Sequence, residues 1–76
     1  MFKITMPSIV KLGRNKRIQL TSDAPEDARA VWIFEGNGQA AVSDDGVAVG
    51  VKVGTGVAQL WANSVMQDAV IIQVVS

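Results

Sequence analysis

The stretch from Val42 to Ala58 decides the fold, and it reads VSDDGVAVGVKVGTGVA. Its valines and small residues favour the pleated, half-buried surface of a strand. Gly46 follows two aspartates and supplies the positive φ that a hairpin connection needs. Glycine recurs at positions 50, 54 and 56, and each glycine costs about 1 kcal/mol inside a helix. The stretch therefore predicts three strands joined by an Asp-Asp-Gly turn and a Gly-Thr-Gly turn.

Short segments of alternating apolar and polar residues fill the rest of the chain. The predicted strands cover residues 3–11, 16–22, 30–35, 40–43, 47–52, 57–63 and 68–75. Pro7 interrupts the first segment and has no backbone N–H, so we expect an edge strand or a strand that switches sheets. The polar loop after Asp23 has room for one helical turn behind Pro25. Seven short strands at this spacing predict one all-β domain over residues 1–76, built as a β-sandwich.

Composition limits the chemistry that the chain can perform. The 76 residues contain no histidine and no cysteine, which excludes disulfides and most transition-metal or nucleophilic chemistry. Seven basic and seven acidic residues balance to zero, so charge gives no reason to expect nucleic acid or a membrane as partner. Hydrophobic residues make up 49% of the chain, which is high for so small a domain and indicates apolar surface with a partner. Residues 1–5 lack the features of a secretory signal, and no apolar run reaches membrane-spanning length.

Polar residues within the strands indicate which faces are buried. Gln59 should face water, so Trp61, two residues further on, shares its outer face. Gln73 marks the outer face of the last strand in the same way, and Trp32 is expected in the core. The predicted partner-binding set is therefore Val31, Ile33, Val57, Trp61 and Ile71. We expect these residues to merge into one apolar patch; the alternative is that a bulge or register shift turns Trp61 into the core.

Three segments carry a family resemblance. They are residues 30–32 (AVW), 40–48 (AAVSDDGVA) and 50–58 (GVKVGTGVA), and residues 13–20 and 70–75 fit the same pattern. The pattern resembles the bacterial immunoglobulin-like family of group 2, the invasin- and intimin-type module also found in virion proteins of tailed phages. The resemblance implies an immunoglobulin-like β-sandwich used for display, spacing or adhesion, without catalytic residues. The chain departs from the family at Ala58, where a larger aliphatic residue is usual, and at Phe34, where a small polar residue is common.

Two groups of charged residues could be interpreted as catalytic or ligand-binding sites, and in both cases we favour the simpler structural interpretation. Asp44 and Asp45 with Glu35 resemble a carboxylate pair or calcium ligands, but turn aspartates usually bond their own backbone and calcium needs about six oxygen ligands. The basic residues between positions 11 and 17 are typical of a solvated turn, because no aromatic residues are interleaved with them. We therefore expect no enzyme, no catalytic residue, no metal site and no cofactor.

Three functions remain as hypotheses. The first is a structural protein of a virion, made in the host cytoplasm: a small capsid decoration or accessory protein of a tailed phage. Its partners would be capsid or other virion proteins, or further copies of itself. It would bind them through the apolar patch or by adding its Pro7-containing edge strand to a neighbour's sheet. The second is a module of a bacterial cell-surface adhesin that binds carbohydrate or protein through a loop such as residues 36–38. The third is the carbohydrate-binding module of an enzyme, with Trp61 as its platform.

Overall fold

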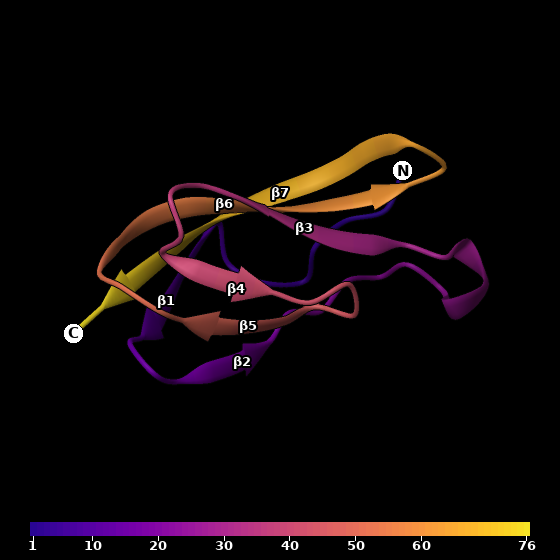
Figure 1. Ribbon diagram of the computed structural model, residues 1–76. Helices are drawn as coiled ribbons and strands as arrows, with labels where there is room; N and C mark the ends of the chain where they lie inside the picture. Colours follow the sequence, from indigo (N-terminus) through magenta and orange to yellow (C-terminus); the bar gives the residue numbers. More distant parts are fainter.

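Two β-sheets packed face to face form the protein, and the computed structural model describes all residues from 1 to 76 (Figure 1). The strands are β1 (Ile9–Gly13), β2 (Arg17–Gln19), β3 (Val31–Glu35), β4 (Ala40–Val42), β5 (Val47–Gly50), β6 (Gly54–Ala62) and β7 (Val65–Val75). One 3₁₀ turn, η1 (Glu26–Ala28), follows Pro25, where a helical turn was predicted. The predicted β-sandwich of seven strands is confirmed. No helix in the structure is long and apolar enough to cross a membrane.

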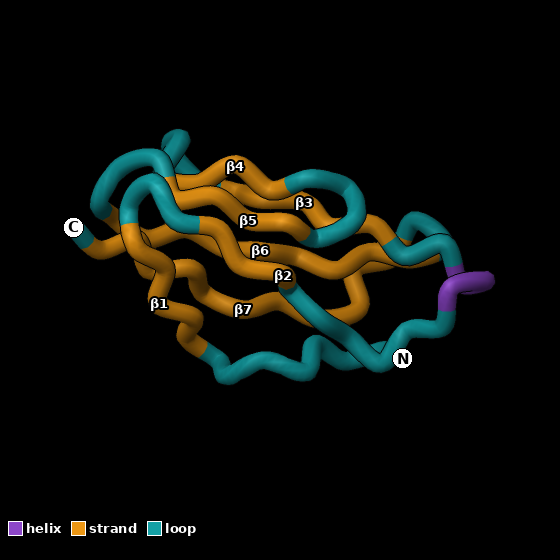
Figure 2. The backbone as a smooth tube through the Cα atoms, turned by 90° about the horizontal axis from the view of Figure 1, so that it is seen from below, coloured by secondary structure: helices purple, strands orange, loops and turns teal.

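The strand order is that of an immunoglobulin-type sandwich. One sheet has the order β1-β7-β6-β3 and the other has the order β2-β5-β4. Lettered A to G along the chain, these are the sheets A-G-F-C and B-E-D, which match the constant-type arrangement except that A lies beside G. β1 and β7 pair in parallel, and every other strand pair is antiparallel. The connecting loops gather at the two ends of the molecule, with η1 beyond one of them (Figure 2).

The first segment of the chain switches sheets at Pro7 and then forms an edge strand, so both predicted arrangements occur. Ile4 forms an isolated antiparallel bridge with Ser22, just beyond β2. The Thr5 N–H donates to the Thr21 carbonyl at 2.9 Å. After Pro7 the chain crosses to the other sheet and pairs with β7 as the edge strand β1. The segment before Pro7 thus ties the two sheets together.

Inward-facing side chains of both sheets form one hydrophobic core. Its members are Ile4, Val10, Leu12, Leu20, Trp32, Ala40, Ala48, Ala58, Leu60, Val70, Ile72 and Val74. Trp32 is only 6% exposed, and its indole lies so close to Gly46 that a Cβ there would come within 2.7 Å of Nε1. The prediction that Trp32 is the core tryptophan is confirmed.

The Asp-Asp-Gly turn forms where the sequence predicts it, between β4 and β5. Gly46 has a φ of 91°, and its N–H donates to the Ser43 carbonyl at 3.0 Å. The Ser43 N–H in turn donates to the Val47 carbonyl at 3.0 Å. Only glycine adopts this backbone conformation without cost, so Gly46 sets the hairpin.

The predicted Gly-Thr-Gly turn is wrong. Residues 54–56 are the first residues of β6, and the connection from β5 is made by residues 51–53. Gly56 is a glycine for a packing reason: the ring of Phe34 occupies the space that a side chain at position 56 would fill. The sequence pattern shows the glycine but not the aromatic ring that requires it.

The turn between β6 and β7 was not predicted. Asn63 and Ser64 both have positive φ, 54° and 63°, and Ala62 pairs directly with Val65. Two central residues at positive φ are typical of a tight hairpin turn. The prediction ended one strand at residue 63 and began the next at residue 68, because Asn-Ser lacks the glycine that usually marks such a turn.

Candidate interaction surface

The four-stranded sheet presents its outward side chains in regular rows. The rows across the strands are Ile9-Ile71-Val57-Glu35, Ala69-Gln59-Ile33, Met66-Trp61-Val31 and Lys11-Gln73-Thr55. The residues of these four rows are called the outer face below. Most of them are apolar, and the rows follow one another along the strands, so the outer face is one continuous surface.

All five residues predicted to bind a partner lie on the outer face. Val31, Ile33 and Ile71 are 39%, 45% and 41% exposed, while Val57 and Trp61 are half-buried. Val31 is paired with Trp61, and Ile71 with Val57, so these side chains are neighbours across the strands. A register shift does occur beside Trp61, but the extra residue lies on β7, and Trp61 stays outside the core.

Hydrogen bonds hold the Trp61 side chain in place. The indole Nε1–H donates to Oε1 of Gln59 at 3.0 Å, and Nε2 of Gln59 donates to Oε2 of Glu35 at 3.0 Å. Gln59 and Trp61 are two residues apart on one strand, so they share a face. A partner can therefore cover the indole without leaving its N–H unpaired, which would otherwise cost about 1–3 kcal/mol.

Two exposed residues extend this surface and were not among the predicted set. Ile9 is 53% exposed beside Ile71, and Met66 is 43% exposed beside Trp61. The interruption at Pro7 left Ile9 without an assigned face, and Met66 was placed outside any strand. Ile9 alternates with the apolar residues on either side of Lys11, and this alternation places the Ile9 side chain on the outward face together with Lys11. No such pattern in the sequence places Met66.

The opposite surface of the molecule is different. The outward side chains of the three-stranded sheet are Arg17, Gln19, Ala41, Val47 and Val49. Val49 is the one large exposed hydrophobic residue among them, at 36%. Val51 and Val53 are also exposed, but they lie in the loop after β5. The concentration of apolar side chains is therefore specific to the outer face.

The acidic residues considered as a carboxylate pair are separated in the structure. Asp44 and Asp45 lie in the β4–β5 turn, whereas Glu35 ends β3 and is bonded to Gln59. The Asp45 carboxylate accepts a hydrogen bond from the Ser43 hydroxyl, within the turn. These aspartates thus belong to the turn, although Asp45 bonds a side chain rather than the backbone.

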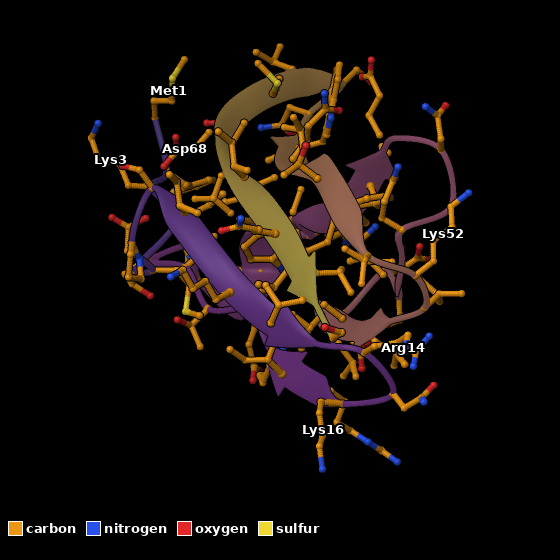
Figure 3. All side chains as sticks on the ribbon, turned by 90° about the vertical axis from the view of Figure 1, so that its left-hand side faces the viewer. Met1, Lys3, Arg14, Lys16, Lys52 and Asp68 are labelled. Carbon is orange, nitrogen blue, oxygen red and sulfur yellow. The ribbon has the colours of Figure 1, made fainter.

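Only part of the basic run lies in the turn at one end of the sandwich. Arg14 and Lys16 flank the turn after β1, and together with Lys52 they project into solvent (Figure 3). All three are exposed. Arg14 and Lys16 therefore lie at a solvated turn, as expected, whereas Lys11 lies within β1 on the outer face and Arg17 begins β2.

Asp68 is a polar anchor that the sequence analysis missed. Its carboxylate accepts hydrogen bonds from the N–H groups of Ile4 and Ala69, both at 2.8 Å. The bond from Ile4, followed by the bond from Ala69, lowers the pKa of Asp68; partial burial opposes this shift, and the charge of nearby Lys3 adds to it (Figure 3). The neighbouring Gln67 accepts from the Phe2 N–H at 3.1 Å. Both side chains bind the N-terminal segment.

No other surface feature competes with the outer face as a site. The molecule has no pocket, and no group of three or more His, Cys, Asp or Glu side chains is placed to hold a metal ion. Comparison with models of known protein families finds no match, and no curated protein matches the sequence. The outer face is therefore the candidate functional site.

Proposed function

We propose that this protein is a non-enzymatic structural component of a virion, a small capsid decoration or accessory protein of a tailed phage that binds through its outer face. The observation that carries the proposal is the run of exposed and half-buried apolar side chains across all four strands of one sheet. A monomer rarely leaves more than a few hundred Å² of contiguous apolar surface uncovered. The resemblance to group 2 bacterial immunoglobulin-like modules, which occur in tailed-phage virion proteins, supports a particle as the setting.

The chemistry of the outer face suits a protein partner. Its apolar side chains are interleaved with the neutral polar residues Gln59, Gln73 and Thr55, and its two charged residues, Lys11 and Glu35, lie on the edge strands. An apolar centre with charges confined to the rim is the usual composition of a protein–protein interface. Because the surface is the open face of a sheet without a pocket, a broad partner surface fits it better than a small molecule does.

Particle association tests the proposal. Virions from a lysate of the phage that encodes the chain are purified on a density gradient, and the chain is quantified by mass spectrometry against the major capsid protein. We expect a fixed ratio between the two across the particle peak. Trp61→Asp should remove the chain from the particles, whereas Val49→Asp, the matched change on the opposite surface, should not. Absence of the unmodified chain from particles would contradict the proposal.

The adhesin hypothesis stays a prediction. Its binding loop, residues 36–38, lies between β3 and β4, and the Asn37 N–H is bonded to the Gln39 side chain at 2.7 Å. A reading frame that continues into a signal peptide and further repeats of the module would favour an adhesin. A flanking capsid or tail gene would favour the virion.

A further inference from the structure

We infer that the partner on the outer face is a second copy of this chain, packed sheet against sheet about a two-fold axis that runs parallel to the strands between β6 and β7. The inference rests on the proposed function in taking the outer face as the interaction surface. It adds the identity of the occupant and the orientation in which it binds.

Charge complementarity is the first argument for a second copy. The outer face has two charged residues, Lys11 on the edge strand β1 and Glu35 on the edge strand β3. A two-fold rotation about an axis along the strands lays β1 of one copy over β3 of the other, because it reverses the strand order. Lys11 then lies one row, about 7 Å along the strands, from Glu35 of the second copy, across the spacing of about 10 Å between packed sheets. The two backbone positions are about 12 Å apart, which two long side chains that both point into the interface can span. Symmetry makes the pair twice.

The apolar residues match under the same rotation. It lays β6 of one copy over β7 of the other, so Trp61 faces Met66 of the second copy and Val57 faces Ile71. A thioether against an indole is a favourable contact of about 0.3–1.5 kcal/mol. The indole N–H needs nothing from the second copy, since Gln59 already accepts from it.

The other two-fold orientation lacks this complementarity. An axis across the strands lays each strand over its own copy, so that Lys11 faces β1 and Glu35 faces β3. Lys11 of one copy and Glu35 of the other are then separated by three strand spacings, which is about 14 Å measured across the strands. The two charged residues of the outer face therefore select the axis along the strands.

The size of the outer face predicts a weak dimer. Four strands about 4.8 Å apart, with rows extending over about 30 Å, cover roughly 500–600 Å² in each copy. The total of about 1,100 Å² lies at the lower limit of specific interfaces. We expect a dissociation constant of about 10 μM, so that the dimer forms only as the concentration rises.

Sedimentation equilibrium of the isolated protein tests the dimer. Between about 1 μM and about 1 mM, a range that brackets weak interfaces, the mass should rise from 8.1 kDa towards twice that value. Trp61→Asp and Ile71→Lys should each keep the protein monomeric, with circular dichroism confirming that they fold. Val49→Asp, on the opposite surface, should leave the dimer unchanged. A monomer throughout the range, or a dimer that survives both outer-face variants, would overturn the inference.

Charge reversal tests the orientation. Lys11→Glu or Glu35→Lys alone should raise the dissociation constant about tenfold, since each variant replaces two attractive pairs by repulsive ones. The double variant restores both pairs and should return the constant to within about threefold of the original. Lys16→Glu, which reverses a charge away from the outer face, should have no such effect. A double variant as weak as the single variants would overturn the two-fold geometry.

The virion function and the outer-face dimer can be contradicted independently of each other. A chain that stays monomeric but copurifies with virions would overturn the second copy as partner and support the virion function. A chain that forms the dimer but is absent from virions would support the inference about the outer face and overturn the virion function.

Discussion

The ring of Phe34 lies over Gly56, in the space that a side chain at position 56 would take. In the register of β3 and β6, Phe34 also stands directly opposite Ala58. A large residue on β3 therefore meets two small residues on β6. Phe34 and Ala58 are directly paired in the sheet, so the larger residue on one strand compensates for the smaller one on the next.

Gly56→Ala is expected to lower the free energy of unfolding by about 2–3 kcal/mol, because the added methyl group overlaps the Phe34 ring. Urea unfolding measures the loss. Thr55→Ala, the exposed neighbour on the same strand, should cost much less. In the double variant Phe34→Leu/Gly56→Ala the smaller side chain leaves room for the methyl group, and the two changes should be coupled by at least about 1 kcal/mol. Strict additivity would contradict this account of the glycine.

Gly46→Ala and Gly38→Ala form a matched pair. Both glycines have positive φ, 91° and 83°, so both variants bear a backbone cost of about 1–2 kcal/mol. A Cβ at position 46 also meets the Trp32 indole at 2.7 Å, whereas the nearest atom at position 38 is Cε of Lys52 at 4.0 Å. Gly46→Ala should therefore destabilise the protein by about 2 kcal/mol more than Gly38→Ala. Thermal unfolding followed by tryptophan fluorescence measures both, and equal losses would show that Trp32 does not depend on Gly46.

Asp68→Asn should destabilise the protein at neutral pH by about 1–2 kcal/mol, because the N–H groups of Ile4 and Ala69 lose an ionised acceptor. The pKa of Asp68 is lowered on folding, so its contribution is fully present above the unfolded value of about 3.9. That contribution is lost as the pH falls through the lower pKa of the folded state. The difference between the original protein and the variant should therefore shrink in acid. Asp27→Asn, in the exposed η1 turn, is the matched control and should leave the free energy of unfolding at neutral pH nearly unchanged.

Gln59→Ala should release the Trp61 side chain. In ¹H–¹⁵N spectra, the indole N–H of Trp61 should move towards the solvent-exposed position and exchange faster with water, because it loses its acceptor. The indole signal of Trp32 should not change, since its ring lies in the core. Gln73→Ala, on the same face but without a bond to the indole, is the control. Unchanged exchange at Trp61 would mean that Gln59 does not hold the ring.

The sequence was sufficient for the faces of the long strands. Alternation around Gln59 and Gln73 separates inward from outward residues, and the structure places Trp61 and Ile71 outside accordingly. Trp32 was expected in the core as a large aromatic residue, and with Trp32 inside, alternation places Val31 and Ile33 outside, where the structure has them. These predictions succeed because period-two alternation is a local property, which each strand carries in its own residues.

Features that depend on residues far apart in the chain could not be predicted from the sequence. A glycine is needed at position 56 because the ring of Phe34, on another strand, fills the space beside it. The residues around Gly56 do not reveal this contact, so the local pattern predicts a turn instead. The carboxylate of Asp68 is explained by the Ile4 N–H, 64 residues away, and by a register shift in β7 that no local pattern announces. Pro7 is an intermediate case. Its missing N–H predicts an edge strand or a change of sheet, and the contacts with Ser22 and β7 show that both occur.

The parallel pairing of β1 with β7 has a mechanical consequence. The two ends of the chain emerge at opposite ends of the sandwich (Figure 1). Tension applied to them draws β1 and β7 lengthwise in opposite directions, since the two strands point the same way. Such shear strains all the hydrogen bonds between them at once, instead of opening them one after another as in unzipping a hairpin. A domain stretched between two attachment points therefore resists unfolding under force at the pair β1 and β7, which carries the applied load.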